Sequence, residues 1–359
     1  MHLWKHAEKW DAPPVATAIT LGEGGTPLVR SVRIGPALGL RNLWFKMEGS
    51  NPTGSYKDRF AASAVSHLMA RGVSACLGTS SGNTGAALAA YCARAGLPCY
   101  LAIVEGAPEG KLRQMAAYGA RLFRIRSFGA SPAVSADVMG GLGALAQELN
   151  AGYEISAFTF SPRGMSGVQT LAFEIADELG GGPLHVFSPA GAGGLTLAVA
   201  RGFARWGSTA HVHCVQPAGN DTIATPLRTG AERARAVESK TQISGLQVGG
   251  VLDGDATVAA CRASGGQGYV VTDDDVWSWQ ARMAREEGLF SEPAGAVALT
   301  GVAQALQRGE LKADDTVVCL VTGSGFKDER SLIRMTGAEG TPLLESFSAF
   351  SSAVREGLG

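Results

Sequence analysis

Lys57 lies where a turn meets the start of a helix, in the segment Asn51-Pro52-Thr53-Gly54-Ser55-Tyr56-Lys57-Asp58-Arg59. Asn-Pro and Thr-Gly are turn dipeptides. The partial positive charge at a helix N-terminus disfavours a lysine cation. The same field, together with partial burial, favours the neutral amine that Schiff-base chemistry requires. The alternative is an exposed lysine beside a solvated Asp58/Arg59 pair, and the position of the lysine alone would favour that alternative.

A polar loop, Thr79-Ser80-Ser81-Gly82-Asn83-Thr84-Gly85, lies between an apolar strand pattern and an alanine-rich helix pattern. Hydroxyl groups, a side-chain amide and free backbone N–H groups at a helix start form an anion site that suits a carboxylate. The alternative is an ordinary helix N-cap with accompanying glycines. A cap needs only one polar residue, whereas this loop supplies five. We therefore expect the loop to bind a carboxylate.

A glycine-rich loop, Ser188-Pro189-Ala190-Gly191-Ala192-Gly193-Gly194, joins a predicted strand to the next predicted helix. Glycines in such a loop let backbone N–H groups converge on a phosphate. Glycine turns also join strands to helices for steric reasons, and this loop lacks the lysine of a P-loop and the spacing of a dinucleotide-binding fingerprint. After the last predicted strand, Thr322-Gly323-Ser324-Gly325 offers hydroxyls to a ring nitrogen, with a plain strand-end turn as the alternative.

Short apolar strands alternate with helices along most of the chain. The predicted strands cover residues 75–77, 99–104, 121–125, 184–188, 211–215 and 316–321. The predicted helices cover residues 58–70, 83–94, 110–118, 133–149, 167–179, 193–206 and 274–287, with Thr272 or Asp273 as the cap of the last one. Apolar strands separated by helices indicate an α/β protein whose mostly parallel sheets carry helices on both faces.

Parallel sheets bind ligands at the carboxyl ends of their strands, so we expect the polar and glycine-rich loops to meet there. Residues 219–254 have the weakest secondary-structure pattern, and we expect them to cover a surface or the mouth of the site.

The composition excludes some classes of function. A formal net charge of −1 gives no electrostatic reason to expect nucleic acid or an anionic membrane as a partner. The sequence contains neither a signal-peptide pattern nor the roughly 18–20 apolar residues of a membrane helix. Six single cysteines without a CxxC pair are typical of reduced, buried thiols, which predicts a cytoplasmic protein. His211 and His213 alternate on one predicted strand without a third ligand nearby in sequence, so no metal site is expected.

Taken together, the motifs resemble those of one family. From about Leu3 to Asp328 the chain is similar to the fold-type II enzymes that depend on pyridoxal 5'-phosphate (PLP), the tryptophan synthase β-subunit-like family, and within it to threonine synthases. The residues that carry the resemblance are Leu21-Gly22-Glu23-Gly24-Gly25-Thr26-Pro27-Leu28, Asn51–Arg59, Ser80–Ala95, Gly110-Lys111, Glu292-Pro293-Ala294-Gly295-Ala296 and Thr322-Gly323-Ser324-Gly325-Phe326-Lys327-Asp328. The resemblance implies a small inserted α/β domain, residues 60–157, and a large cofactor-binding domain, residues 1–59 and 158–359. PLP would lie in the cleft between them, and closure of the small domain would exclude water.

The resemblance also implies roles for single residues. Lys57 would be the catalytic residue, forming a Schiff base with PLP and later moving protons. Asn83 would hydrogen-bond the ring hydroxyl of the cofactor, and Thr322 would face its pyridine nitrogen. The cofactor phosphate would be bound by Ala190, Gly191, Ala192, Gly193 and Gly194. The substrate carboxylate would be held by Ser80, Ser81, Asn83 and Thr84, and the candidates for a substrate phosphate are Lys111, Ser161 and Arg163, with Ser80 and Thr84.

The chain departs from the threonine synthase pattern in one region. The family often shows Asn-Pro-(Tyr/Phe)-Arg-Leu-Glu-Gly-Gln-Lys-Thr, whereas this chain has Ser161-Pro162-Arg163-Gly164-Met165-Ser166-Gly167-Val168-Gln169-Thr170. The arginine is shifted, and the asparagine, the acid and the lysine are missing. In the family this region lies near the distal group of the substrate, so the departure bears on phosphohomoserine recognition. Phe60 also stands where a small residue commonly follows the Lys-Asp-Arg sequence.

These observations predict a PLP-dependent lyase of the threonine synthase type, which converts O-phosphohomoserine and water to threonine and phosphate in amino-acid biosynthesis. The alternative enzyme eliminates or replaces a β-substituent, as a threonine or serine ammonia-lyase or a phosphoserine-using synthase does. A catalytically silent PLP-binding protein is a third hypothesis, which the intact lysine, asparagine and carboxylate loop disfavour. The expected partner is a small amino-acid substrate, with neither nucleic acid nor membrane, and the expected assembly is a homodimer.

Overall fold

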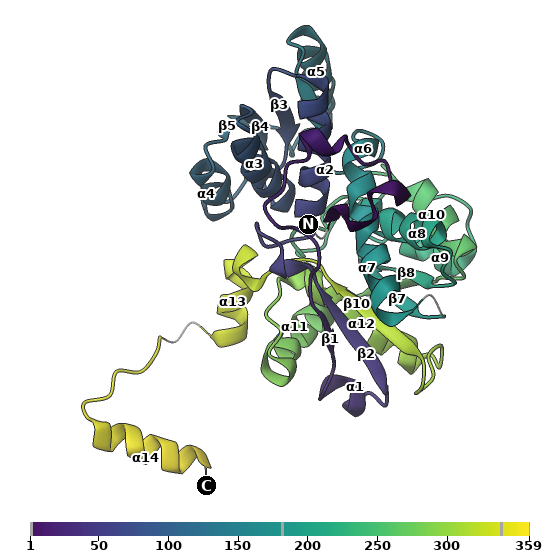
Figure 1. The fold of residues 1–359 in the computed structure, drawn as a ribbon. Helices are drawn as coiled ribbons and strands as arrows, with labels where there is room; N and C mark the ends of the chain where they lie inside the picture. The colour runs from purple at the N-terminus through teal and green to yellow at the C-terminus, as the bar shows by residue number, and fades with distance from the viewer. Residues whose placement is uncertain (1–2, 181–182, 338–339, 359) are drawn as a thin grey trace.

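The computed structural model of the chain describes residues 3–180, 183–337 and 340–358, which contain two β-sheets (Figure 1). The larger sheet has six strands in the order β1 (Leu28–Arg30), β2 (Asn42–Met47), β10 (Thr316–Val321), β7 (His185–Pro189), β8 (His211–Pro217) and β9 (Gly268–Val271). The smaller sheet has four strands in the order β5 (Arg121–Ile125), β4 (Cys99–Val104), β3 (Cys76–Thr79) and β6 (Gly152–Glu154). Neighbouring strands run parallel except for β1 and β2.

Helices cover both sheets. Helices α3 and α5 contact the smaller sheet, whereas α8 and α12 contact the larger one. The α-helices are α1 (Ile34–Ala37), α2 (Lys57–Arg71), α3 (Asn83–Ala95), α4 (Glu109–Ala117), α5 (Pro132–Glu148), α6 (Pro162–Ser166), α7 (Thr170–Leu179), α8 (Gly194–Trp206), α9 (Ala224–Thr229), α10 (Gly254–Ala263), α11 (Asp273–Glu287), α12 (Pro293–Gln307), α13 (Glu329–Thr336) and α14 (Phe347–Leu358). The predicted fold class, mostly parallel sheets with helices on both faces, is therefore confirmed.

The sequence predicted β4 and β10 with their observed bounds, because their residues are apolar and parallel strands are buried on both faces. It also predicted the bounds of β5, an edge strand that contains two arginines and has no fully buried residue. The helix predicted over residues 167–179 is instead a short 3-10 helix, η4 (Gly167–Gln169), followed by α7. Strand β2 was missed because the buried Lys46 interrupts its apolar pattern. The smaller sheet lies within residues 76–154, and the expected small domain at residues 60–157 stays a prediction.

Two departures from the family pattern pack against each other. Phe60, in α2, is fully buried. A Cβ atom added at Gly164, in α6, would lie 2.7 Å from Cε2 of Phe60. Carbon atoms that are not bonded prefer separations of about 3.5–4.0 Å, so a side chain at position 164 would overlap the ring. Phe60 therefore occupies the space that a larger residue 164 would need.

The C-terminal helix α14 stands apart from the two sheets and their helices (Figure 1). It exposes Phe347 and Phe350, whose side chains are 79% and 52% accessible. Within the described ranges, none of the helices combines the length and the apolar character that crossing a membrane requires. All six cysteines are buried, as expected.

Candidate active site

Lys57 is the first residue of α2, and the turn before it pairs with the loop after β10. The backbone N–H of Tyr56 donates to the carbonyl of Thr322 at 3.0 Å, and the N–H of Ser324 donates to the carbonyl of Gly54 at 2.9 Å. These bonds place Lys57 beside Thr322 at the carboxyl end of the larger sheet, where α/β proteins bind ligands.

The residues that follow Lys57 are buried, so the alternative of a solvated Asp58/Arg59 pair is wrong. Asp58 accepts hydrogen bonds from the N–H and the hydroxyl of Thr53 at 2.9 and 2.8 Å. Burial raises the pKa of Asp58 to about 6, although the Thr53 bonds oppose this rise. The Asp58 carboxylate thus closes the turn that precedes the helix.

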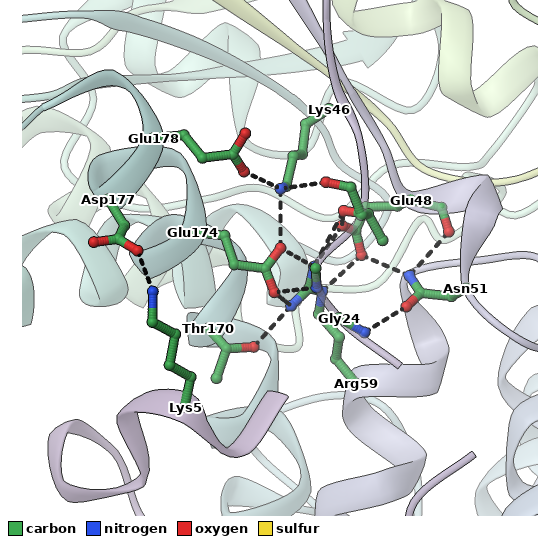
Figure 2. A network of polar contacts seen from close by, with 12 residues as sticks. Lys5, Gly24, Lys46, Glu48, Asn51, Arg59, Thr170, Glu174, Asp177 and Glu178 are labelled. Atoms are coloured by element: carbon green, nitrogen blue, oxygen red, sulfur yellow. Dashed lines mark hydrogen bonds and ion pairs between the residues drawn. The ribbon is translucent and has the colours of Figure 1, made fainter. Parts of the chain in front are cut away.

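Arg59 belongs to a buried ion network that anchors the first turn of α2 (Figure 2). Its guanidinium donates to Glu48 at 2.7 and 2.8 Å and to Glu174 at 2.6 and 2.8 Å. Lys46 in β2 adds ion pairs of 2.9 Å with Glu174 and 3.1 Å with Glu178. Removing one partner of a buried ion pair costs about 3–5 kcal/mol. The network therefore fixes the helix start, and with it Lys57, against β2 and α7.

The Lys57 amine lies at one end of a short chain of hydrogen-bonded hydroxyl groups. Its Nζ donates to Oγ of Ser156 at 2.6 Å, and that oxygen lies 2.8 Å from Oγ1 of Thr84 in the polar loop. Burial lowers the pKa of Lys57 from 10.5 to about 7, while the charges of Glu292 and Asp253 act in the opposite direction. At neutral pH a large fraction of the amine is therefore uncharged, the form that acts as a nucleophile or base.

Asn83, at the start of α3, lies opposite a buried carboxylate. Its Nδ2 donates to both oxygens of Glu292, at 3.0 and 3.1 Å. Burial raises the pKa of Glu292 to about 7, against the opposing effects of Asn83, Lys327 and Lys111. Sequence analysis placed Glu292 in a family motif but not in the site. Its position just before Pro293 at the start of a helix was the only hint in the sequence. This pattern does not predict the direction of the Glu292 side chain.

The glycine-rich loop has the form of an anion site. Gly193 has φ +98° and precedes α8, and no side chain caps this helix start. A Cβ atom at Gly193 would lie 2.4 Å from Oγ1 of Thr257, so only glycine fits. The first N–H groups of a helix without a cap attract a phosphate. Gly191, Ala192 and Gly194 complete the loop together with Ala190, which is buried.

Thr322 supplies a free hydroxyl. Its Oγ1 is buried and lacks a hydrogen-bond partner among the residues that the structure describes. An unpaired buried hydroxyl costs about 1–3 kcal/mol, and a bound ring nitrogen would remove that cost.

Two lysines lie close enough to Glu292 to lower its pKa. Lys111, in α4, donates from Nζ to Oγ of Ser244, in the stretch that was expected to cover a surface or the site mouth. Lys327 donates to Oε1 of Gln114 at 2.6 Å, and burial lowers its pKa. Sequence analysis named Lys111 as a site residue and missed Lys327, although the latter stands in the quoted motif after β10.

The remaining candidates differ in their placement. Ser80 accepts a hydrogen bond from the N–H of Gly82 at 3.2 Å and shapes the polar loop, and Ser81 is half-buried in the same loop. Ser161 is buried and accepts from the N–H of Ile155 at 2.9 Å, so its hydroxyl is used within its own turn. The Arg163 side chain is 60% exposed beside Asp11, at 3.9 Å. The structure therefore does not bring Arg163 to the group around Lys57, because Gly164, and not Arg163, faces α2 from this turn of α6.

Comparisons with known proteins identify the relatives of this chain. A family model described as pyridoxal-phosphate dependent enzyme matches residues 19–323. The threonine synthase of Methanocaldococcus jannaschii is 32% identical over 342 residues, which cover 92% of this chain and 82% of that protein. The threonine synthase of Mycobacterium leprae is 33% identical over 329 residues, which cover 89% of this chain and 86% of that protein.

Solved structures share the fold. The processed form of threonine deaminase isoform 2 from Solanum lycopersicum matches with a TM-score of 0.75 and 22% identity, covering 94% of both chains. Diaminopropionate ammonia lyase from Escherichia coli also matches with a TM-score of 0.75, with 17% identity, covering 94% of this chain and 93% of that one.

Proposed function

Because the chain belongs to the family of pyridoxal-phosphate dependent enzymes, we propose that it converts O-phosphohomoserine and water to threonine and phosphate, with Lys57 as the catalytic residue. The observation that carries the proposal is the buried Lys57 amine, whose pKa is lowered to about 7, within a site that also contains two lysines. The relatives named threonine synthase support the choice of reaction.

The residues of the site fit PLP. The unpaired hydroxyl of Thr322 suits the pyridine nitrogen, and the uncapped start of α8 at Gly193 suits the phosphate. The Asn83 amide, which donates to the Glu292 carboxylate, also suits the ring hydroxyl of the cofactor. When bound, the cofactor withdraws electrons from the carbon atoms of the substrate, and a hydroxyl at the ring nitrogen makes it a milder electron sink than a carboxylate would.

Lys57 is the residue that moves protons. The proposed reaction takes protons from Cα and Cβ as phosphate leaves Cγ, then returns protons at Cγ and Cα while water adds at Cβ. A base with a pKa of about 7 can both accept and return a proton near neutral pH. Ser156 accepts a hydrogen bond from Nζ and so directs the amine toward the polar loop that would hold the substrate carboxylate.

Lys111 and Lys327 would bind the substrate phosphate. A phosphate dianion is costly to bury without cationic partners. Both lysines donate to neutral groups, Ser244 and Gln114, so neither charge is consumed by a carboxylate contact there. This pair replaces Arg163 in our proposal.

A threonine or serine ammonia-lyase is the second candidate. The observation that favours it is the Phe60–Gly164 contact, which leaves no room at position 164 for the arginine of the threonine synthase pattern. An ammonia-lyase needs no phosphate site, so the two lysines distinguish the candidates.

The test is to supply the PLP-loaded protein with phosphohomoserine, phosphoserine, threonine and serine while measuring phosphate, 2-oxo acids and new amino acids. We expect threonine and phosphate in equal amounts from phosphohomoserine. Lys111→Met and Lys327→Met should each lower kcat/KM for phosphohomoserine by roughly 10–100-fold, the effect of losing a charged hydrogen bond. Lys312→Met, at an exposed position, is the control. A higher specificity constant for 2-oxobutanoate release from threonine would instead establish the ammonia-lyase.

We also propose a homodimer in the cytoplasm, with the small domain at residues 60–157. The exposed Phe347 and Phe350 of α14 support a second copy as a partner, since large exposed apolar side chains often pack in an interface. Six buried cysteines suit a reducing compartment. Light scattering of the protein, with and without residues 340–359, would test the assembly.

A further inference from the structure

Three buried cysteines meet in the interior of the smaller sheet, outside the site around Lys57. Cys76 and Cys99 are direct partners on the parallel strands β3 and β4, so both side chains leave the same face of the sheet. Cys92 lies on α3, which packs against both strands. The three sulfur atoms all lie within 4.8 Å of one another.

This spacing is close to that of a metal site. Metal–thiolate bonds of about 2.3 Å place two ligand sulfurs about 4 Å apart, so the cluster needs to contract by less than about 1 Å. Each cysteine belongs to a regular helix or strand, so binding requires no loop to fold.

The donor set selects the ion. Thiolates prefer soft ions such as Cu(I) and Zn(II). Structural zinc sites almost always have four ligands, whereas in the described part of the chain no His, Asp or Glu joins the three cysteines. Three thiolates suffice for Cu(I), which accepts trigonal coordination.

An entry route is present as well. Cys92 and Cys99 line a cavity of about 290 Å³, together with residues that include Pro98, Tyr118 and Arg121. The cavity therefore brings a route from the surface to two of the three cysteine residues, and a workable metal site requires such a route.

We propose that Cys76, Cys92 and Cys99 form a three-coordinate binding site for Cu(I). On binding, three S–H bonds break, three S–Cu bonds form and three protons leave to solvent. Copper remains Cu(I), so the step needs no oxidant or reductant. The site joins β3, α3 and β4, and the polar loop Thr79–Gly85 connects the first two of these elements. Cys76 is the first residue of β3 and Cys92 lies in the last turn of α3, so an occupied site would join the two elements at the ends remote from that loop.

The test uses the reduced, PLP-loaded full-length protein under anaerobic conditions, titrated with Cu(I) against a colorimetric Cu(I) chelator. We expect one equivalent to bind, with a sulfur-to-copper absorption band in the near ultraviolet and a raised Tm. Cys92→Ser and Cys99→Ser should each weaken Cu(I) binding at least about 100-fold. Cys261→Ser in α10 and Cys319→Ser in β10 change buried cysteines outside the smaller sheet, and they should leave Cu(I) binding unchanged.

A second measurement does not depend on variants that fold. In the native sequence, Cu(I) should slow the alkylation of Cys76, Cys92 and Cys99 relative to Cys214, Cys261 and Cys319. Three results would each overturn the proposal: failure to bind one equivalent of Cu(I), uniform alkylation of all six cysteines, or binding of Zn(II) in preference to Cu(I). So would a two-hydrogen loss of mass without retained copper, because it would indicate a disulfide in place of a metal site.

Discussion

Replacing Gly193 by alanine tests whether the glycine-rich loop binds the cofactor phosphate. Gly193 has φ +98°, and an added Cβ atom would lie 2.4 Å from Oγ1 of Thr257 and 2.8 Å from Cδ1 of Ile223. A left-handed conformation costs a residue other than glycine roughly 1–2 kcal/mol, and the overlap adds to this cost. Without the cofactor, the loop of the variant can relax away from Thr257.

Binding of PLP must then restore the strained loop. If about 2 kcal/mol of the strain opposes binding, the Kd for PLP rises about 30-fold. The assay is equilibrium dialysis of the apoprotein with PLP, followed by the absorption of the bound cofactor.

Gly207→Ala, at the other end of α8, is the matched control. Gly207 also has a positive φ, of +81°, but no atom would lie within 4 Å of its added Cβ. We expect this control to lose about 1–2 kcal/mol of stability and to bind PLP normally. The double variant Gly193→Ala/Thr257→Ala should recover part of the affinity. If Gly193→Ala binds PLP as the native protein does, the loop only connects β7 to α8.

Three further predictions concern single side chains. Lys57→Ala should abolish the covalent, borohydride-reducible attachment of PLP, and a reducible link in this variant would assign the catalytic role to another lysine. Ser156→Ala removes the hydrogen bond of 2.6 Å that the Lys57 amine donates, and this bond favours the charged amine. The acidic limb of the kcat–pH profile should therefore move down from about pH 7 by about one unit. An unmoved limb would contradict a positioning role for Ser156. Burial raises the pKa of Glu154 from 4.5 to about 7, so this group stabilises the fold fully below pH 4.5 and loses on the order of 3 kcal/mol as the pH rises through 7. Glu154→Gln should therefore gain stability relative to the native protein between pH 5 and pH 8 in urea unfolding, and an equal difference at both pH values would refute this.

The sequence predicted which loops form the site, because the periodicity located the strands and parallel strands end at a common edge. The roles of Lys57, Asn83 and Thr322 came from the family resemblance, and they stay predictions. Ser156 could not be named, since β6 has only three residues and an ordinary serine after it carries no pattern. Glu292 and Lys327 stood in recognised motifs, but their side-chain directions depend on how α12 and the loop after β10 pack.

Arg163 shows a second limit of sequence reasoning. A shift of one residue turns a side chain by about 100° around a helix. The arginine of this chain therefore points to solvent beside Asp11, although its residue type suits a phosphate. Only the packing of α6 against α2 decides which residue of this turn faces inward.

The contact between Phe60 and Gly164 also restricts how this sequence could have arisen. An ancestor with a small residue at position 60 and a large residue at position 164 needed two substitutions to reach this sequence. Either order passes through an intermediate with a disturbed core. Introducing the phenylalanine first would have overlapped the large residue, at a cost of about 1–3 kcal/mol or more. Losing the large residue first would have left a cavity, which destabilises a core but is tolerated more often than overlap when the fold has stability to spare. The glycine is therefore the expected earlier substitution, and a lineage that carries Gly164 with a small residue 60 would represent the surviving intermediate.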